Sequence, residues 1–169
     1  PKHSTGLGNW SDVGTGKTLS AILADRFMFH EAKKAASTRG AQFDNQQVTL
    51  VLCPNSVSLQ WAEKTSLYFP NVYEIVVINS STKQTSKGFR IENNLPECGK
   101  ALAWNTRRPQ LVIINYDKLS DPKKSEERMR SLLKSFDNRL GLVILDEIHA
   151  VKVRGGKVVP SPVAGDDND

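Results

Sequence analysis

The chain has 169 residues, of which 38% are hydrophobic and 24% are charged, a balance typical of a globular domain with a real core. No hydrophobic run is long enough to cross a membrane, and the first ten residues lack the apolar stretch of a secretory signal, so we expect an intracellular protein with no membrane partner. The formal net charge of +5 permits nucleic-acid binding but does not by itself indicate it.

Strand and helix patterns alternate along the chain, which predicts an α/β fold with right-handed crossovers. The strand-like runs are nearly continuous in Val, Ile and Leu, as expected for parallel strands buried on both faces. In chain order we predict a helix at 17–36, a strand at 48–53, a helix at 56–66, strands at 73–78 and 110–115, a helix at 125–136 and a strand at 140–146.

Each predicted helix has an apolar side that should face the sheet. In the second helix Trp61 is expected in the core, and in the third Ser125 is a candidate N-cap. The other residues expected on these apolar sides are Leu19, Ile22, Leu23, Phe27 and Phe29 in the first helix, Leu59 in the second, and Met129, Leu132, Leu133 and Phe136 in the third.

The remaining segments have weaker patterns. Residues 79–108 are polar and predict loops with a short helix near Ala101, and residues 154–169 read as a loop or frayed tail. Cys53 and Cys98 match no metal or disulfide spacing, so we expect two reduced thiols, with Cys53 in the core.

The stretch "SDVGTGKTLSAI" predicts a phosphate-binding loop at the start of the first helix. Gly14 and Gly16 let backbone N–H groups turn toward an anion, Lys17 can reach the phosphates of ATP, and Thr18 can bind Mg²⁺. Ser11 stands where the usual loop has glycine, and the preceding "STGLGNW" makes a poor strand. A glycine turn before an alanine-rich helix is the alternative interpretation.

A second motif, "LVILDEIHAVK", supplies carboxylates at the end of a predicted strand, where α/β sheets bind their ligands. Asp146 would hold Mg²⁺ through water, and Glu147 would orient or deprotonate an attacking water. His149 could respond to the γ-phosphate or to an adjoining domain. The alternative is that these are ordinary strand-end carboxylates and a surface or core histidine.

Four motifs in order resemble superfamily-two helicases and translocases. "SDVGTGKTLSAI" is similar to the D-E-M-G-L-G-K-T-L-Q-A-I of SWI/SNF-type chromatin-remodelling ATPases, "LVLCPNSVSLQWAEK" to their motif Ia, "LVIINYDKL" to I-T-T-Y-E-x-L, and "DEIHAVK" to D-E-G-H-R-I-K. Those enzymes often lack the first glycine of the loop, which accounts for Ser11. Ile148 replaces their usual glycine, Asn115 their threonine, and Val153 a frequent asparagine.

The resemblance implies a three-layer α/β/α P-loop NTPase, the N-terminal RecA-like lobe of a DNA-dependent ATPase, over residues 1–153. It implies ATP and Mg²⁺ as cofactors, and double-stranded DNA or chromatin and a second RecA-like lobe as partners. Carried over by residue, it places nucleotide contacts at Val13, Gly14, Thr15, Gly16, Lys17, Thr18, Leu19 and His149, catalysis at Lys17, Asp146 and Glu147, Mg²⁺ at Thr18 and Asp146, and nucleic-acid contacts at Pro54, Asn55, Ser56, Asn115 and Tyr116.

The resemblance leaves alternatives. The chain lacks an initiator Met, motif III and the arginine-bearing second lobe, so we expect a fragment that binds nucleotide weakly and turns it over near background. A non-hydrolysing nucleotide-binding or scaffold module and another superfamily-two enzyme, such as a restriction-type translocase or RNA helicase, stay open. Ser56 could simply cap its helix and Tyr116 could pack on the sheet. A nuclear location follows only from the family.

Overall fold

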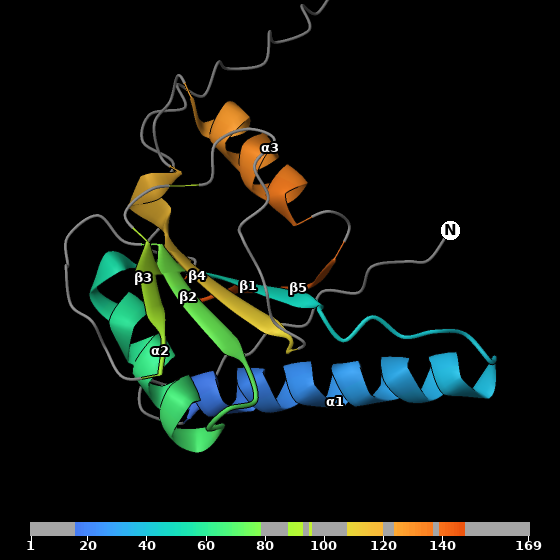
Figure 1. The fold of residues 1–169 in the computed structure, drawn as a ribbon. Coiled ribbons are helices and arrows are strands. Elements are labelled where there is room, and N and C mark those ends of the chain that lie inside the picture. Colours follow the sequence, from blue (N-terminus) through green and yellow to red (C-terminus); the bar gives the residue numbers. More distant parts are fainter. Residues whose placement is uncertain are drawn as a thin grey trace, which may run out of the picture.

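The computed structural model describes residues 16–78, 88–92, 95, 108–119, 124–136 and 139–147, and helices and strands alternate through them (Figure 1). The poor strand "STGLGNW", the expected helix near Ala101, Cys98 and the tail lie outside these residues. The elements are α1 (Lys17–Thr38), β1 (Val48–Cys53), α2 (Asn55–Tyr68), β2 (Glu74–Ile78), β3 (Arg90–Glu92), β4 (Gln110–Asn115), the 3₁₀ helix η1 (Tyr116–Lys118), α3 (Ser125–Ser135) and β5 (Leu140–Leu145).

The strands form one five-stranded parallel sheet in the order β3-β2-β4-β1-β5. Helices α1 and α2 cover one face, where Ile22 and Trp61 pack with strand residues such as Val51. Helix α3 covers the other face through Leu132 and Phe136. The predicted three-layer α/β/α architecture with a parallel sheet is therefore confirmed, because hydrophobic residues on both faces of the central strands each find a helical layer.

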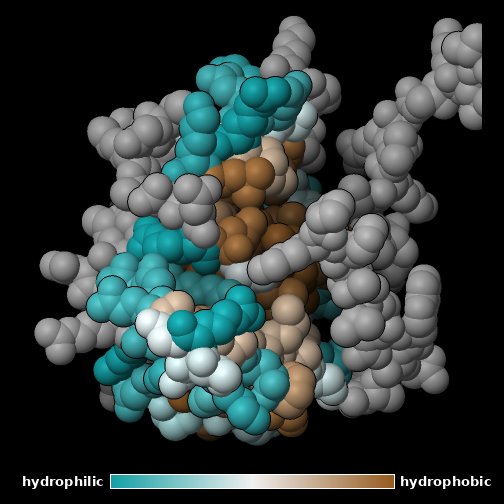
Figure 2. All heavy atoms as spheres, turned by 90° about the vertical axis from the view of Figure 1, so that its right-hand side faces the viewer, coloured by the Kyte–Doolittle hydropathy of each residue, from teal (hydrophilic) through white to brown (hydrophobic). Residues whose placement is uncertain are grey.

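The prediction of burial on both faces holds for the central strands but is wrong for β5. Every residue of β1 and β4 is buried, whereas exposure alternates along β5. Val143 and Leu145 are 43% and 49% exposed, while Ile144 packs against the core. The cause is position, since β5 pairs only with β1 and is an edge strand among the described residues. Figure 2 shows hydrophobic side chains at the surface between α3 above and α1 below.

Several local predictions need correction. Strand β3 lies within the segment expected to be loops. In α1 the buried residues are Ile22, Asp25 and Phe29, spaced as one helical stripe, so three residues expected to be buried are exposed. In α3 Ser125 is the first helical residue rather than the N-cap, and Lys124 holds that position without a side-chain cap. The exposed residues that were expected to be buried are Leu19, Leu23, Phe27 and Leu133.

A buried polar network fixes α1 against the sheet. The Asp25 carboxylate accepts hydrogen bonds from the Thr49 hydroxyl of β1 at 2.6 Å and from the Tyr73 hydroxyl just before β2. The Arg26 guanidinium lies over the rings of Phe29 and Tyr73, 4.4 and 5.5 Å from their centroids. Burial and the neighbouring Asp25 raise the pKa of Tyr73, so its hydroxyl stays a donor. The network ties the middle of α1 to β1 and to the residue before β2.

Candidate functional site

The candidate site lies where β1, β4 and β5 end. Asp146 follows β5 directly, and its backbone N–H donates to the Leu52 carbonyl of β1 at 2.8 Å, which extends the pairing one residue past the strand. Glu147 then turns the chain with a φ of 53°, a left-handed conformation that is uncommon for a residue with a Cβ. The two carboxylates therefore stand at the carboxyl edge of the parallel sheet, as the sequence predicts.

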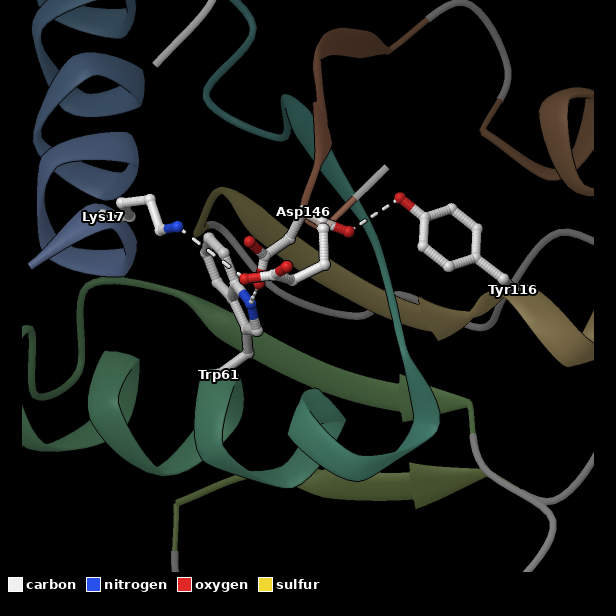
Figure 3. A network of polar contacts seen from close by, with 5 residues as sticks. Lys17, Trp61, Tyr116 and Asp146 are labelled. Atoms are coloured by element: carbon white, nitrogen blue, oxygen red, sulfur yellow. Dashed lines mark hydrogen bonds and ion pairs between the residues drawn. The ribbon is translucent and has the colours of Figure 1, made fainter. Parts of the chain in front are cut away.

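The start of α1 faces these carboxylates. Gly16 holds the N-cap position with a φ of 82°, which favours glycine, and no side chain of the described residues caps the helix. The first turn carries no acidic residue, and the N–H groups and partial positive charge of a helix start attract anions. The Lys17 ammonium lies 3.7 Å from a Glu147 carboxylate oxygen, and both side chains are 29% exposed. Residues far apart in sequence thus meet in one site (Figure 3).

Two aromatic residues hold Asp146, and one of these contacts was not predicted. The indole N–H of Trp61 donates to Asp146 Oδ2 at 2.7 Å, and the Tyr116 hydroxyl donates to the Asp146 backbone carbonyl at 2.9 Å. In Figure 3 Lys17 and Tyr116 approach Asp146 from opposite sides. The expected burial of Trp61 is confirmed, at 2% exposure. A buried indole N–H usually needs a hydrogen-bond acceptor, and this is the only signal in the sequence for the contact of Trp61 with Asp146.

The motif residues after β1 and β4 lie side by side, because Cys53 pairs with Asn115 in the sheet. Asn115 is buried; its amide donates to the Asn55 side-chain oxygen at 3.0 Å and accepts from the Lys118 N–H at 2.9 Å. Asn55 and Ser56 are exposed in the first turn of α2. Pro54 is the N-cap residue, so Ser56 does not cap this helix. The structure therefore presents Asn55 and Ser56 outward and holds Asn115 beneath them.

Burial raises the pKa of two groups that lie beside Asp146. Burial first, then the Asp146 charge, raises the pKa of Cys53 to about 12. Burial first, followed by the electrostatic influence of Cys53, Asp146 and Glu147, raises the pKa of Tyr116 to about 12. Both groups are therefore protonated near neutral pH. Tyr116 keeps its donor hydrogen, and Cys53 stays an inert core thiol, as expected from the sequence.

Of the remaining candidate residues, two lie in the first turn of α1 and the others lie outside the described residues. Thr18 is half-buried on the first turn of α1, one residue after Lys17. Leu19 is 38% exposed on the same turn. The predicted nucleotide contacts at Val13, Gly14, Thr15 and His149 lie outside the described residues.

The donors present fit a magnesium-bound phosphate better than a metal cage built by protein alone. Within the described ranges no three His, Cys, Asp or Glu residues gather to hold a metal ion. Asp146 precedes Glu147 and Thr18 follows Lys17, and their carboxylate and hydroxyl oxygens are hard donors; Mg²⁺ typically takes one or two such ligands and completes its shell with water and phosphate. Asp146 Oδ1 accepts no hydrogen bond from a described residue, which leaves this oxygen for the ion or its water. None of the described helices has the length and hydrophobicity to span a membrane.

Together the fold and site define a parallel α/β domain in which a lysine at the start of a helix meets carboxylates at a strand end. The chain belongs to the SNF2-related domain family, whose sequence model matches residues 10–159. This match confirms the resemblance to superfamily-two helicases and translocases and, with the five-stranded parallel sheet, the RecA-like fold class.

The chain also matches a helicase/translocase whose name does not include SNF2. The chain is 28% identical over 153 residues to the general transcription and DNA repair factor IIH helicase/translocase subunit XPB of Enterocytozoon bieneusi (strain H348). The match covers 89% of this chain and 20% of that relative, so the chain spans about a fifth of the relative's length. No solved structure matches the chain.

Proposed function

We propose that this chain is the ATP-binding lobe of a DNA-dependent ATPase of the chromatin-remodelling type, which moves on double-stranded DNA when joined to a second RecA-like lobe. One observation carries the proposal: Lys17 at the start of α1 lies 3.7 Å from Glu147, directly after Asp146 at the end of β5. A phosphate-binding lysine and a catalytic carboxylate have to meet in this way for a nucleotide to lie between them. Family membership supports the helicase-like class.

The proposed chemistry follows from what each side chain can do. The N–H groups at the start of α1 and the Lys17 ammonium bind the β- and γ-phosphates, while Thr18 and Asp146 hold Mg²⁺. The ion, when bound, neutralises charge that develops on the phosphates. Phosphate competes with Glu147 for Lys17, so nucleotide binding releases the Glu147 carboxylate to orient the attacking water. In the structure Glu147 is therefore held by its ion pair with Lys17.

The proposed DNA surface lies at the same edge of the sheet. The exposed Asn55 and Ser56 offer an amide and a hydroxyl that suit phosphate oxygens, and such contacts position a protein without reading sequence. Pro54 orients the start of α2. Asn115 is proposed to act from beneath by fixing the Asn55 side chain, and Tyr116 by holding Asp146.

Two alternatives carry less support. A non-hydrolysing nucleotide-binding or scaffold module has no need for Glu147 beside Lys17, yet the two side chains meet here. The relative's printed name, a DNA repair helicase/translocase, favours a DNA enzyme over an RNA helicase. A lobe boundary at residue 153 and a nuclear location belong to the proposal as well.

The isolated chain is expected to bind Mg-ATP weakly and to turn it over near background, with or without double-stranded DNA. The reason is that an arginine finger from the opposite side contributes about 10³–10⁵ in rate in enzymes of this class. Phosphate release measured with increasing DNA, with the Lys17→Ala chain as the blank, tests this. Robust DNA-stimulated turnover by the chain alone would contradict the requirement for a second lobe.

A further inference from the structure

We propose that Trp61 is a positioning residue for magnesium: its indole N–H holds the Asp146 carboxylate in the orientation that presents Oδ1 to the ion. This inference rests on the proposed function, because it assigns a role within the same site. The sequence motifs place Trp61 on α2 and Asp146 after β5, but they predict no contact between the two.

The hydrogen bond is well placed for this task. Trp61 Nε1 lies 2.7 Å from Asp146 Oδ2, and the indole is 2% exposed in the core formed by α1, α2 and the sheet (Figure 3). A bond this short to an ionised acceptor is among the stronger kinds in proteins. Because packing fixes the indole ring, its N–H fixes the carboxylate plane in turn.

Asp146 is held at three atoms. Its backbone N–H donates to the Leu52 carbonyl, its own carbonyl accepts from the Tyr116 hydroxyl, and Oδ2 accepts from Trp61. Strand β1, helix η1 and helix α2 therefore each set one part of this residue. Oδ1 is left without a described donor. Removal of a hydrogen-bond partner of this kind from a metal ligand typically lowers metal affinity or activity about 10- to 100-fold.

The position of Trp61 also gives the bond a consequence for DNA. Helix α2 begins at Asn55, and Trp61 follows about two turns later on the same rigid element. A ligand that shifts the exposed start of α2 would therefore shift the donor that orients Asp146. The bond would therefore connect the proposed DNA surface to the proposed magnesium ligand.

The test is the Mg²⁺ dependence of ATP binding to the full chain. Trp61→Phe keeps an aromatic ring in the core but removes the N–H. We expect it to reduce the gain in ATP affinity produced by Mg²⁺ by about 10-fold, with affinity in EDTA unchanged. Thr65→Val is the matched control, because it removes another buried hydrogen bond of α2, from the Thr65 hydroxyl to the Trp61 carbonyl at 2.8 Å. This control should leave the Mg²⁺ dependence as it is.

Each outcome decides the proposal. A folded Trp61→Phe chain with unchanged Mg²⁺ dependence would overturn it, as would an equal loss in Mg²⁺ and EDTA, which would mark a purely structural role. If the unsubstituted chain binds no Mg-ATP, the proposed function itself fails. A second measurement avoids the substitution at Trp61: with Trp10 and Trp104 changed to Phe, Trp61 is the remaining tryptophan, and its emission should change when Mg²⁺ is added to the ATP-bound chain. Unchanged emission would contradict the proposal.

Discussion

Replacing Lys17 by alanine is expected to weaken Mg-ATP binding by the chain about 10- to 100-fold. The lysine supplies a charge-assisted hydrogen bond to phosphate, and such bonds contribute about 1.5–3 kcal/mol. The substitution also removes the Lys17–Glu147 ion pair at 3.7 Å, so a positive charge is lost beside the Glu147 carboxylate where the phosphates are proposed to bind. Both effects act in the same direction. Equilibrium titration with a fluorescent ATP analogue measures the change.

The matched control is Lys33→Ala. Lys33 is exposed on the same helix, so this variant removes an identical charge far along α1 from the site. It should bind Mg-ATP as the unsubstituted chain does. Equal weakening in both variants would mean that net charge alone attracts the nucleotide and that Lys17 has no specific role.

Replacing Glu147 by glutamine is expected to lower ATP turnover by the proposed two-lobed protein about 10²- to 10⁴-fold, the range of general acid–base catalysis. Glutamine keeps the size of the side chain but cannot accept a proton from water. ATP binding should be retained or tightened, because Lys17 no longer has to leave an ion pair before it meets phosphate. The predicted signature is therefore slow turnover with undiminished affinity.

Glu63→Gln serves as the control for this change, because Glu63 is exposed on α2 and loses the same charge. Single-turnover phosphate release and equilibrium binding, measured side by side, separate chemistry from affinity. Turnover within about threefold of the unsubstituted protein would remove Glu147 from the catalytic role, since even a weak general base contributes far more.

Much of the fold was predictable because the Val, Ile and Leu content of the strands indicates that they are buried. The predicted bounds of β1 and β4 match the structure, and β2, β5 and the helices differ by one or two residues. Strand β3 could not be predicted from its three residues, two of them charged. It forms by parallel pairing with β2, where Arg90 also reaches Glu74. Such a strand depends on tertiary contacts rather than on its own propensity.

The faces of the helices were harder to predict than their ends. Asp25 is the buried residue in the middle of the α1 stripe, at 7% exposure, where hydrophobic pattern alone favours Leu23. A carboxylate is stable there only because Thr49 and Tyr73 donate to it, and those donors are distant in sequence. A hydrophobic pattern describes one helix at a time, so it cannot predict hydrogen-bond donors that come from β1 and from the residue before β2.

The candidate site, like the fold, could be predicted only in part from the sequence. Its chemistry was predictable from motif residues, since Lys17, Asp146 and Glu147 follow from the two loops, and the structure brings all three together. Its supporting contacts were not. The bond from Trp61 to Asp146 joins α2 to the end of β5 and depends on the packing of both. The predicted roles of these residues in ATP hydrolysis stay predictions.

The most direct test of the central claim is where Mg-ATP binds. In an NMR titration of the ¹⁵N-labelled chain, the largest amide shifts should fall on Gly16, Lys17 and Thr18 at the start of α1 and on Asp146 and Glu147 after β5, saturating together as one site. The Lys17→Ala chain should show these shifts only at much higher nucleotide concentration. No saturable shifts, or shifts confined to other parts of the chain, would contradict a nucleotide site at this edge of the sheet.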